Sequence, residues 1–496
     1  MRRGRLTLGC VCAVAAAGGV PAAAARGSDP APTTPIEHFV VLMQENHSFD
    51  NYFGTYPSAD GIPEGACMPI EPAKGRRGGC VAPFHLGSRR AQDTPLGNST
   101  RIARRQYNGG RMNGFISAFT EEAGTFEPAV MGYYDDREIP YYWNVAKEYV
   151  LFDRFFASSA GGTLRNHMFW TAAAPGELEG GRAPRGGFRG HQTIFDRLER
   201  RGVSWKFYVE NYDPRITYRS RGSGRQRAQL LRVPLLGFPR FVDDRRLFAK
   251  VVDLSEYYED LERGTLPAVA YIAPSGSSEH PPGDVKAGQT LVRTLISALM
   301  RSAAWRSSAF MWTYDSPGGW YDHVRPPKVD GSRLGFRVPA LLVSPYARRG
   351  VVDSTPLEFA AIPRFIERNW GLEPLSRWDA RAGSLVRSLD FSQSPRAPEL
   401  VSPGREVRGP PDARRSVIYP IYGAALLVTV LALATAAIRS RSSMAALDEL
   451  WTPQGGGDQV ALIDTIEDTH GQAPTTALDR SEMKEMIADS ISRLPE

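Results

Sequence analysis

The segment at residues 36–54, which reads IEHFVVLMQENHSFDNYFG, constrains the fold more than any other part of the chain. An apolar run of strand length stops abruptly at Glu45 and Asn46 and continues into polar and aromatic residues. Such a run predicts a buried parallel strand. Open α/β sheets bind ligands at the carboxyl ends of their strands, so Glu45 and Asn46 form a candidate pair of metal ligands.

An alternative interpretation is that the residues after Glu45 only cap the next helix, because Asn and Ser are favoured at helix N-termini. A second segment of the same form favours the ligand interpretation. Residues 308–314, SAFMWTY, run apolar and aromatic directly into Asp315. Two buried strands that both end in oxygen ligands can converge on one hard cation.

Further apolar runs alternate with segments of helical pattern across the body of the chain. The predicted strands lie at residues 150–156, 203–210, 268–273 and 338–344. An amphipathic helix is predicted at residues 284–302, between the last two strands. A run of small residues precedes Thr163, and small residues let the backbone bend tightly and expose a hydroxyl. Interleaved strands and helices predict a layered α/β sheet.

Composition agrees with a globular protein: 42% of the 496 residues are apolar and 23% are charged. The net charge of +6 is modest for this length, and no nucleic-acid partner is expected. Arginines nevertheless crowd residues 76–111 and 215–245. They are either scattered surface charges or a docking surface for anionic lipid or phosphate.

The first 25 residues have a basic start, a short apolar middle and an Ala-rich end, which is the form of a secretory signal peptide. Cys10 and Cys12 would leave with this leader. The two remaining cysteines, Cys67 and Cys80, are expected to form a disulfide in an oxidising compartment.

Residues 417–438 carry no charge and are long enough to cross a bilayer as a helix. The preceding segment, residues 392–416, is rich in Pro, Ser and Arg and is predicted to be an extended tether. If the leader is cleaved, the body lies outside the cell and residues 439–496 form an acidic cytoplasmic tail. This arrangement predicts a single-pass cell-membrane protein, whose tail is disordered or folds on a cytoplasmic partner.

Several motifs resemble the bacterial phosphoesterase family of phosphatidylcholine-type phospholipase C and acid phosphatase. They occur in the family's order between about residues 36 and 372: QENHSFDNYFG, YNGGRMNGF, MGYYDDREIPYYWNVAKEYVLFDRFFAS, SSAGGTLRNHMF, EHPPGDVKAGQ, TYDSPGGWYDHVRPP and LGFRVPALLVSPYARRG. The resemblance implies a catalytic domain at residues 36–391 with the α/β/α sandwich and mostly parallel sheet of the alkaline-phosphatase-like superfamily. It also implies a phosphoryl ester substrate.

The resemblance assigns roles by position. Glu45, Asn46 and Asp315 would bind a divalent metal ion. Thr163 would be the nucleophile and a further ligand of the metal. His280 would protonate the leaving alkoxide, since imidazole titrates near neutral pH.

Three other positions are expected near the phosphate. Asn166 matches a family residue expected there, and His167 follows it where relatives commonly have Arg. Asn98 falls where the family usually has His. The chemistry implied is attack by a metal-activated hydroxyl on phosphorus, followed by hydrolysis of a phospho-threonine.

The sequence departs from the family pattern at three positions. Ser316 replaces a second acid after Asp315, Asn98 replaces a His, and Phe359 with its alanine neighbours replaces a His followed by Thr-Ser. These changes lower the negative charge of the site and remove donors to phosphate.

The predicted function is an exported, membrane-anchored, metal-dependent phosphoesterase that acts on phospholipid or a small phosphoester. The alternative is a degenerate phosphoesterase domain that acts as a cell-surface binding or signalling module.

Overall fold

The computed structural model describes residues 29–87, 96–97, 99–405 and 423–436. Its contacts divide the chain into two units, Met1–Val407 and Arg408–Glu496. In the second unit, residues 423–436 are helical. Within the described ranges, no helix combines the length and the apolar character needed to span a membrane. The predicted signal peptide and tail, and both ends of the predicted membrane segment at 417–438, lie outside the described residues.

An eight-stranded sheet forms the centre of the first unit. Its strand order is β15 (Val351–Asp353), β6 (Val150–Phe152), β14 (Ala340–Val343), β11 (Ser308–Tyr314), β1 (His38–Gln44), β10 (Val269–Ala273), β8 (Trp205–Val209) and β9 (Val251–Asp253). All neighbours pair in parallel except β14, which runs antiparallel to β11 and to β6. The prediction of an α/β fold with a large, mostly parallel sheet is confirmed.

The central strand β1 lies between β10 and β11, and its apolar side chains are buried on both faces. Continuous apolar sequence is typical of such doubly covered strands. β1 and β11 pair in register along their whole length, so that Gln44 lies opposite Tyr314. Glu45 and Asp315 are the next residues of the two strands and therefore leave the sheet side by side.

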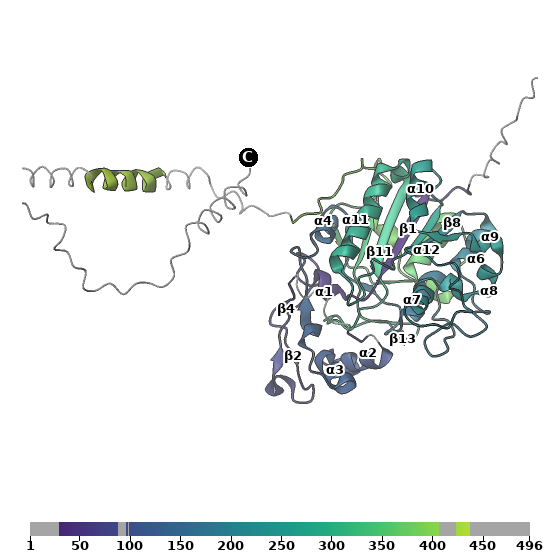
Figure 1. Cartoon of the computed structure of the whole chain (residues 1–496), viewed down its shortest axis with the longest axis horizontal. Coiled ribbons are helices and arrows are strands. Elements are labelled where there is room, and N and C mark those ends of the chain that lie inside the picture. Colours follow the sequence, from purple (N-terminus) through teal and green to yellow (C-terminus); the bar gives the residue numbers. More distant parts are fainter. Residues whose placement is uncertain (1–28, 88–95, 98, 406–422, 437–496) are drawn as a thin grey trace, which may run out of the picture. The chain divides into compact units, whose positions relative to one another are not determined.

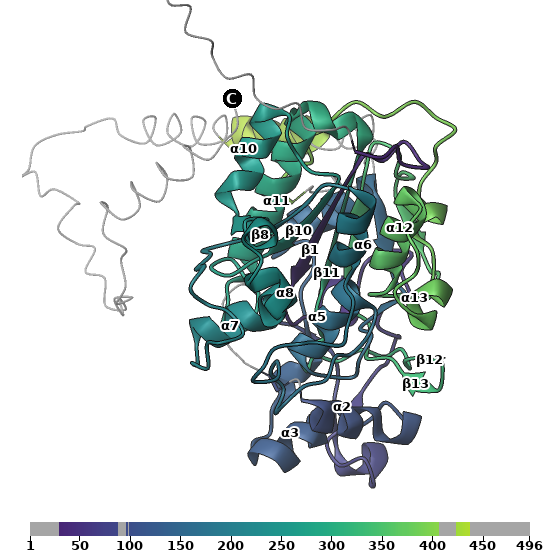
Figure 2. The same cartoon turned by 90° about the vertical axis from the view of Figure 1, so that its right-hand side faces the viewer.

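Helices cover both faces of the sheet (Figures 1 and 2). One group contains α4 (Pro140–Glu148), α10 (Ser255–Arg263) and α11 (Val285–Arg301), and the other contains α5 (Thr163–Ala172), α6 (Ile194–Arg201) and α12 (Ala361–Trp370). The long helix α11 buries Leu291, Leu295 and Leu299, which recur every four residues along one side. This stripe explains why the predicted amphipathic helix packs on the sheet.

The remaining elements are short and lie between the main strands and helices. The helices are α1 (Phe49–Phe53), α2 (Thr100–Tyr107), α3 (Phe115–Ala123), α7 (Arg225–Arg232), α8 (Pro239–Val242), α9 (Arg245–Phe248) and α13 (Arg377–Arg381). The strands are β2 (Met68–Pro69), β3 (Cys80–Val81), β4 (Phe84–His85), β5 (Gly132–Tyr133), β7 (Phe155–Phe156), β12 (Lys328–Val329), β13 (Ser332–Arg333) and β16 (Leu357–Glu358). Single 3₁₀ turns are η1 (Gly75–Gly78), η2 (Asn108–Gly110), η3 (Pro128–Met131), η4 (Pro234–Gly237), η5 (Ala303–Ser307) and η6 (Leu385–Ser388).

The predicted disulfide between Cys67 and Cys80 is present, with the two Cα atoms 5.5 Å apart. It closes a loop whose ends already pair as strands β2 and β3. The segment that follows the sheet also contacts the domain. Trp305 donates its indole N–H to the carbonyl of Arg396 (3.0 Å), and Asn144 donates to the carbonyl of Gly404 (2.8 Å). The first part of the predicted tether therefore packs on the domain, and the first unit continues to Val407.

Candidate active site

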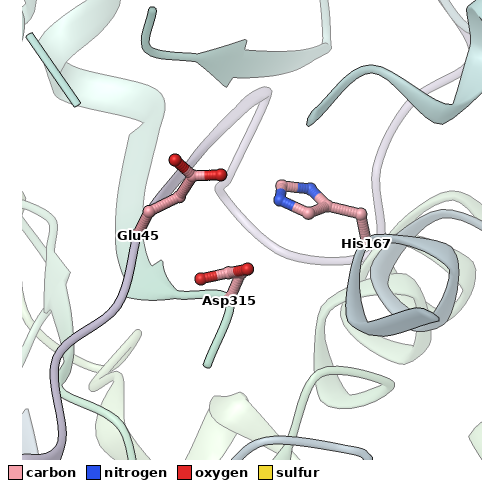
Figure 3. Close-up of side chains that lie close together, drawn as sticks. All are labelled: Glu45, His167 and Asp315. Atoms are coloured by element: carbon pink, nitrogen blue, oxygen red, sulfur yellow. The ribbon is translucent and has the colours of Figure 1, made fainter. Parts of the chain in front are cut away.

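Three buried side chains that could hold a metal ion converge at the carboxyl ends of β1 and β11. Glu45, His167 and Asp315 each offer one ligand atom, and these atoms lie within 4.8 Å of one another. Figure 3 shows the three side chains pointing toward a common centre. Glu45 and Asp315 directly follow the paired strands, and His167 projects from helix α5. The sheet register therefore supplies two groups and the packing of α5 supplies the third.

Glu45 is held as a charged carboxylate. Its Oε2 accepts hydrogen bonds from Nη2 of Arg232 (2.5 Å) and from Oγ of Ser278 (2.9 Å). Burial raises the pKa of Glu45, but the charge and hydrogen bond of Arg232 outweigh it and hold the pKa at about 2. Glu45 is therefore ionised at neutral pH.

Among the described residues Asp315 forms no ion pair, and the charge of Arg232 only partly offsets the rise in its pKa. Burial raises the pKa of Asp315 well above its usual value, and the nearby Glu45 charge raises it further. The Thr163 hydroxyl and the Asn46 backbone lie near enough to favour the charged form, yet neither carboxylate oxygen has a hydrogen bond of normal geometry. A buried carboxylate in this condition is suited to a cation.

His167 is fully buried, and neither of its ring nitrogens has a hydrogen-bond partner among the residues that the structure describes. Burial lowers the pKa of His167 to about 3, despite the favourable charge of Glu45. The imidazole is therefore neutral, and one ring nitrogen carries a lone pair. A neutral imidazole is the form in which His binds metals.

This set of donors fits a divalent cation. Two carboxylates and one neutral imidazole are common first-row metal ligands, and the partnerless atoms of His167 and Asp315 are those that an ion would satisfy. Asn46, the other predicted ligand, lies beside them with φ of 68°. Its Oδ1 accepts a 2.5 Å hydrogen bond from Ser316, so its role as a ligand stays a prediction.

Thr163 is the first residue of α5 and lies next to Asp315. The preceding residue, Gly162, has φ of 93°, a conformation that favours glycine. The side chain of Asn166 accepts from the backbone N–H of Ser159 (2.8 Å) and donates to its carbonyl (3.3 Å). Asn166 thus fixes the bend before Thr163, while its predicted contact with phosphate stays a prediction.

His280 is exposed, near enough to Glu45 to help lower the pKa of that carboxyl. Its Nδ1 lies 2.6 Å from the carbonyl oxygen of Pro281. A carbonyl only accepts, so Nδ1 carries the proton and Nε2 is the atom that can exchange one. This position is consistent with the predicted role of a proton donor to a leaving group.

The departures from the family pattern have different structural outcomes. Ser316 replaces a carboxylate with the neutral hydrogen bond to Asn46 described above. Phe359 is fully buried and packs on Phe155, with ring centroids 5.9 Å apart. Asn98, the predicted substrate contact, lies outside the described residues.

Sequence reasoning missed two parts of this site. Arg232 comes from α7, and its position in an arginine-rich segment gave no sign that it pairs with Glu45.

Glu279 is fully buried and accepts hydrogen bonds from three tyrosine hydroxyls, those of Tyr52 (2.5 Å), Tyr142 (2.5 Å) and Tyr314 (2.8 Å). Burial raises the pKa of Glu279 to about 7. These contacts hold the loop that carries Ser278 and His280.

A second group of potential metal ligands in the described residues is His85, Asp135 and Glu138. It differs from the first because its charges are already paired. His85 lies 2.7 Å from Glu138, and Arg137 donates from Nε (2.9 Å) and from Nη2 (2.6 Å) to Asp135. This group is an ion-pair cluster at the surface.

The phosphoesterase family matches residues 36–373. The chain is 28% identical over 451 residues to phospholipase C A of Mycobacterium tuberculosis (strain CDC 1551 / Oshkosh), which covers 76% of this chain and 82% of that protein. It is 26% identical over 413 residues to non-specific phospholipase C6 of Arabidopsis thaliana, covering 73% and 74% of the two chains. A solved structure, the phosphonate monoester hydrolase of Agrobacterium radiobacter, matches with 12% identity and a TM-score of 0.36, covering 71% of this chain and 77% of that one.

The chain therefore belongs to the phosphoesterase family. The family match and the similarity to phospholipases C together show that the chain is a hydrolase that acts on phosphoric ester bonds. The resemblance stated from the motifs and the prediction of enzymatic activity are both confirmed.

Proposed function

We propose that this protein is a metal-dependent phosphoesterase that cleaves phospholipid head groups through Thr163. The observation that carries the proposal is the convergence of Glu45, His167 and Asp315 beside the Thr163 hydroxyl. Relatives named phospholipase C in bacteria and plants support phospholipid as the substrate class.

Glu45, Asp315 and His167 would hold the divalent cation, with Thr163 beside it. When bound, such an ion stabilises negative charge on phosphoryl oxygens and lowers the pKa of a coordinated hydroxyl. Arg232 balances the charge of Glu45. A bound 2+ ion would favour the ionised form of Asp315, whose pKa burial and the Glu45 charge raise.

The protein residues carry the chemical steps. Oγ of Thr163 loses its proton to solvent and forms a bond to phosphorus as the bond to the leaving alkoxide breaks. His280, with both ring nitrogens protonated, gives the proton on Nε2 to the departing oxygen and keeps the one on Nδ1. A water molecule then attacks phosphorus, His280 takes a proton from that water, and the bond between phosphorus and Oγ breaks. Oγ regains a proton from solvent, which regenerates Thr163.

The location of the protein is proposed on sequence grounds. The signal-like residues 1–25 and the apolar residues 417–438 support an exported enzyme with a membrane anchor. The disulfide is compatible with an oxidising compartment. An extracellular catalytic domain would then face lipid head groups.

The proposal is tested with the purified full-length chain. Hydrolysis of p-nitrophenyl phosphate and p-nitrophenyl phosphorylcholine is measured with and without chelator, for the parent and for Thr163→Ala. We expect chelation and the substitution each to lower kcat by about 10³-fold or more. The substitution removes the nucleophile, and chelation removes the ion that would activate it. Faster turnover of the phosphorylcholine diester would support the phospholipase assignment.

Thr163→Ser should keep part of the activity, because it keeps a hydroxyl at the bend. Thr290→Ala is the matched control, since Thr290 is exposed on α11 and bonds only its own helix backbone. Equal rates for Thr163→Ala and the parent would end the nucleophile assignment. A bound metal without turnover on either ester would instead favour a binding module.

A further inference from the structure

A cavity of about 170 Å³ lies between helix α2 and residues 333–336. Its walls are mostly apolar and include Ala103, Ala160, Leu334 and Phe336. This volume has room for a short apolar segment of a ligand.

Both walls of the cavity are attached to segments of the candidate active site. Gly335 donates its backbone N–H to the carbonyl of Ala157 (2.7 Å), and Ala157 donates to the carbonyl of Phe336 (3.1 Å), just before the bend at Thr163. On the other side, Gln106 of α2 donates to the carbonyl of Gly319 (2.7 Å). Gly319 belongs to the loop that begins at Asp315. The cavity thus adjoins the two loops that carry the nucleophile and a metal ligand.

Two arginines contact Tyr107, which lines this cavity, and a third lies on the same helix. The guanidinium of Arg333 stacks on the Tyr107 ring, 3.7 Å from its centroid, and Nε of Arg325 donates to the Tyr107 hydroxyl (3.0 Å). Arg104 lies one turn before Tyr107 on α2 and lines the cavity. All three arginines are exposed.

These arginines carry positive charge that nearby carboxylates do not balance. In the part of the chain that the structure describes, no Asp or Glu oxygen lies within 4.0 Å of Arg104, Arg325 or Arg333. The neighbouring acids are already engaged: Glu121 pairs with Arg105, and Asp330 pairs with Arg381. Three cations beside an apolar cavity form a site for an anionic amphiphile.

We propose that this cavity is a substrate subsite that selects phospholipids with a second anionic group in addition to the scissile phosphodiester. The inference rests on the proposed function and adds to it the charge of the preferred substrate. A short apolar part of the lipid enters between α2 and residues 333–336. The second anionic group is bound by Arg104, Arg325 and Arg333. A zwitterionic lipid leaves these arginines without a partner.

The test uses two water-soluble lipids that differ by one phosphate: dihexanoyl phosphatidylinositol and its 4-phosphate. The full-length parent should hydrolyse the phosphorylated lipid with a kcat/KM about tenfold higher, because charge-assisted hydrogen bonds are gained. The double variant R104Q/R333Q should lose this preference, so that its kcat/KM values for the two lipids become equal. Equal kcat/KM values of the parent for the two lipids would overturn the inference.

The matched control is R301Q/R306Q, which removes the same charge. Arg301 ends α11 and Arg306 lies just before β11, at the opposite end of that strand from Asp315. It should keep the preference. A parallel loss in both double variants would mean that net charge, and not this subsite, sets the preference.

A second variant tests the apolar part. Thr100→Phe places a ring at the mouth of the cavity from an exposed position at the start of α2. It should raise KM for the dihexanoyl lipids and leave p-nitrophenyl phosphate hydrolysis unchanged. An unchanged KM would contradict occupation of the cavity.

Binding measurements separate this inference from the proposed function. Calorimetry on Thr163→Ala should show tighter binding of the phosphorylated lipid, and R104Q in this background should weaken it. If the parent hydrolyses no ester but this binding preference persists, the proposed function fails and the subsite stands. If hydrolysis occurs without any binding preference, the subsite fails alone.

Discussion

Two buried charged clusters draw on the segment that follows β1, and they differ in how far their polar atoms are satisfied. In the first, Glu45, His167 and Asp315 meet, and atoms of His167 and Asp315 have no hydrogen-bond partner. In the second, Arg337 pairs with Asp50 (2.8 Å) and with Asp322 (3.0 Å) and is itself fully buried. The first cluster has polar atoms that could bind a ligand, and we call it the open cluster. In the second, the charged groups are paired with one another, and we call it the closed cluster.

Every nitrogen of Arg337 has an acceptor. Nε donates to Asp322, Nη2 donates to Asp50, and Nη1 donates to the carbonyls of Asp60 (2.7 Å) and Asp153 (2.9 Å). Burial lowers the pKa of Arg337, but the two carboxylates outweigh it, and the pKa is raised overall. Buried charge is therefore not enough to mark a functional site: unsatisfied buried charge points to a ligand, and saturated buried charge to a structural role.

Breaking the closed cluster should have the largest effect on stability. Arg337→Met leaves Asp50 and Asp322 buried without their counter-charge, and removing one partner of a buried pair costs about 3–5 kcal/mol. We expect a loss of this size in the free energy of unfolding, measured by urea denaturation.

The control is Arg381→Met, because Arg381 is 66% exposed where it pairs with Asp330. An exposed pair contributes at most about 1 kcal/mol. Similar losses in both variants would show that the Arg337 cluster is not a special structural element.

Glu279 is an intermediate case, because its side-chain partners are three neutral tyrosine hydroxyls and it forms no ion pair with any described residue. Burial raises its pKa from 4.5 to about 7, so the folded state holds the proton more tightly than the unfolded state. This contribution to stability is present below pH 4.5 and is lost as pH rises through 7. The parent should lose on the order of 3 kcal/mol from this group between pH 4.5 and pH 8.

Glu279→Gln should remove that part of the pH dependence, which is read from urea midpoints at pH 5 and pH 8. Glu262→Gln is the control, since Glu262 is exposed on α10. An unchanged pH slope in Glu279→Gln would mean that the carboxyl is ionised in the folded protein at pH 5.

The open cluster should respond to metal. A divalent cation at about 100 times its Kd should stabilise the folded state by about 2.7 kcal/mol, because it binds that state alone. The measurement is the Tm of the chelator-treated chain with Mg²⁺, Ca²⁺, Mn²⁺ or Zn²⁺ added singly. Asp315→Asn should abolish the rise in Tm.

Asp322→Asn provides the matched comparison within the closed cluster. It should lower the starting Tm and keep the rise on adding metal, because Asp322 does not contribute to the open cluster. A rise in Tm that survives in Asp315→Asn would place the metal elsewhere.

The sequence predicted that Glu45 and Asp315 lie at the ends of two strands, and the sheet places these two ends side by side. Glu45 and Asp315 each follow an apolar run, and parallel strands bring such positions to one edge of the sheet. The direction of β14 could not be read in the same way, because an apolar run of strand length fits a parallel or an antiparallel neighbour. His167 was assigned to phosphate from its neighbour Asn166, but the rotation of α5 places it with the carboxylates.

The alternation of strands and helices, the two acidic strand ends and the family motifs can all be read from the amino-acid sequence. These depend on local hydrophobic patterns and residue order. The folded structure was needed to show that Arg232 neutralises Glu45 and that Glu279 lies among three tyrosines. It also shows which buried polar atoms of the described residues lack a hydrogen-bond partner. Charge pairing depends on distances between elements that are far apart in the chain, and no local pattern encodes those distances.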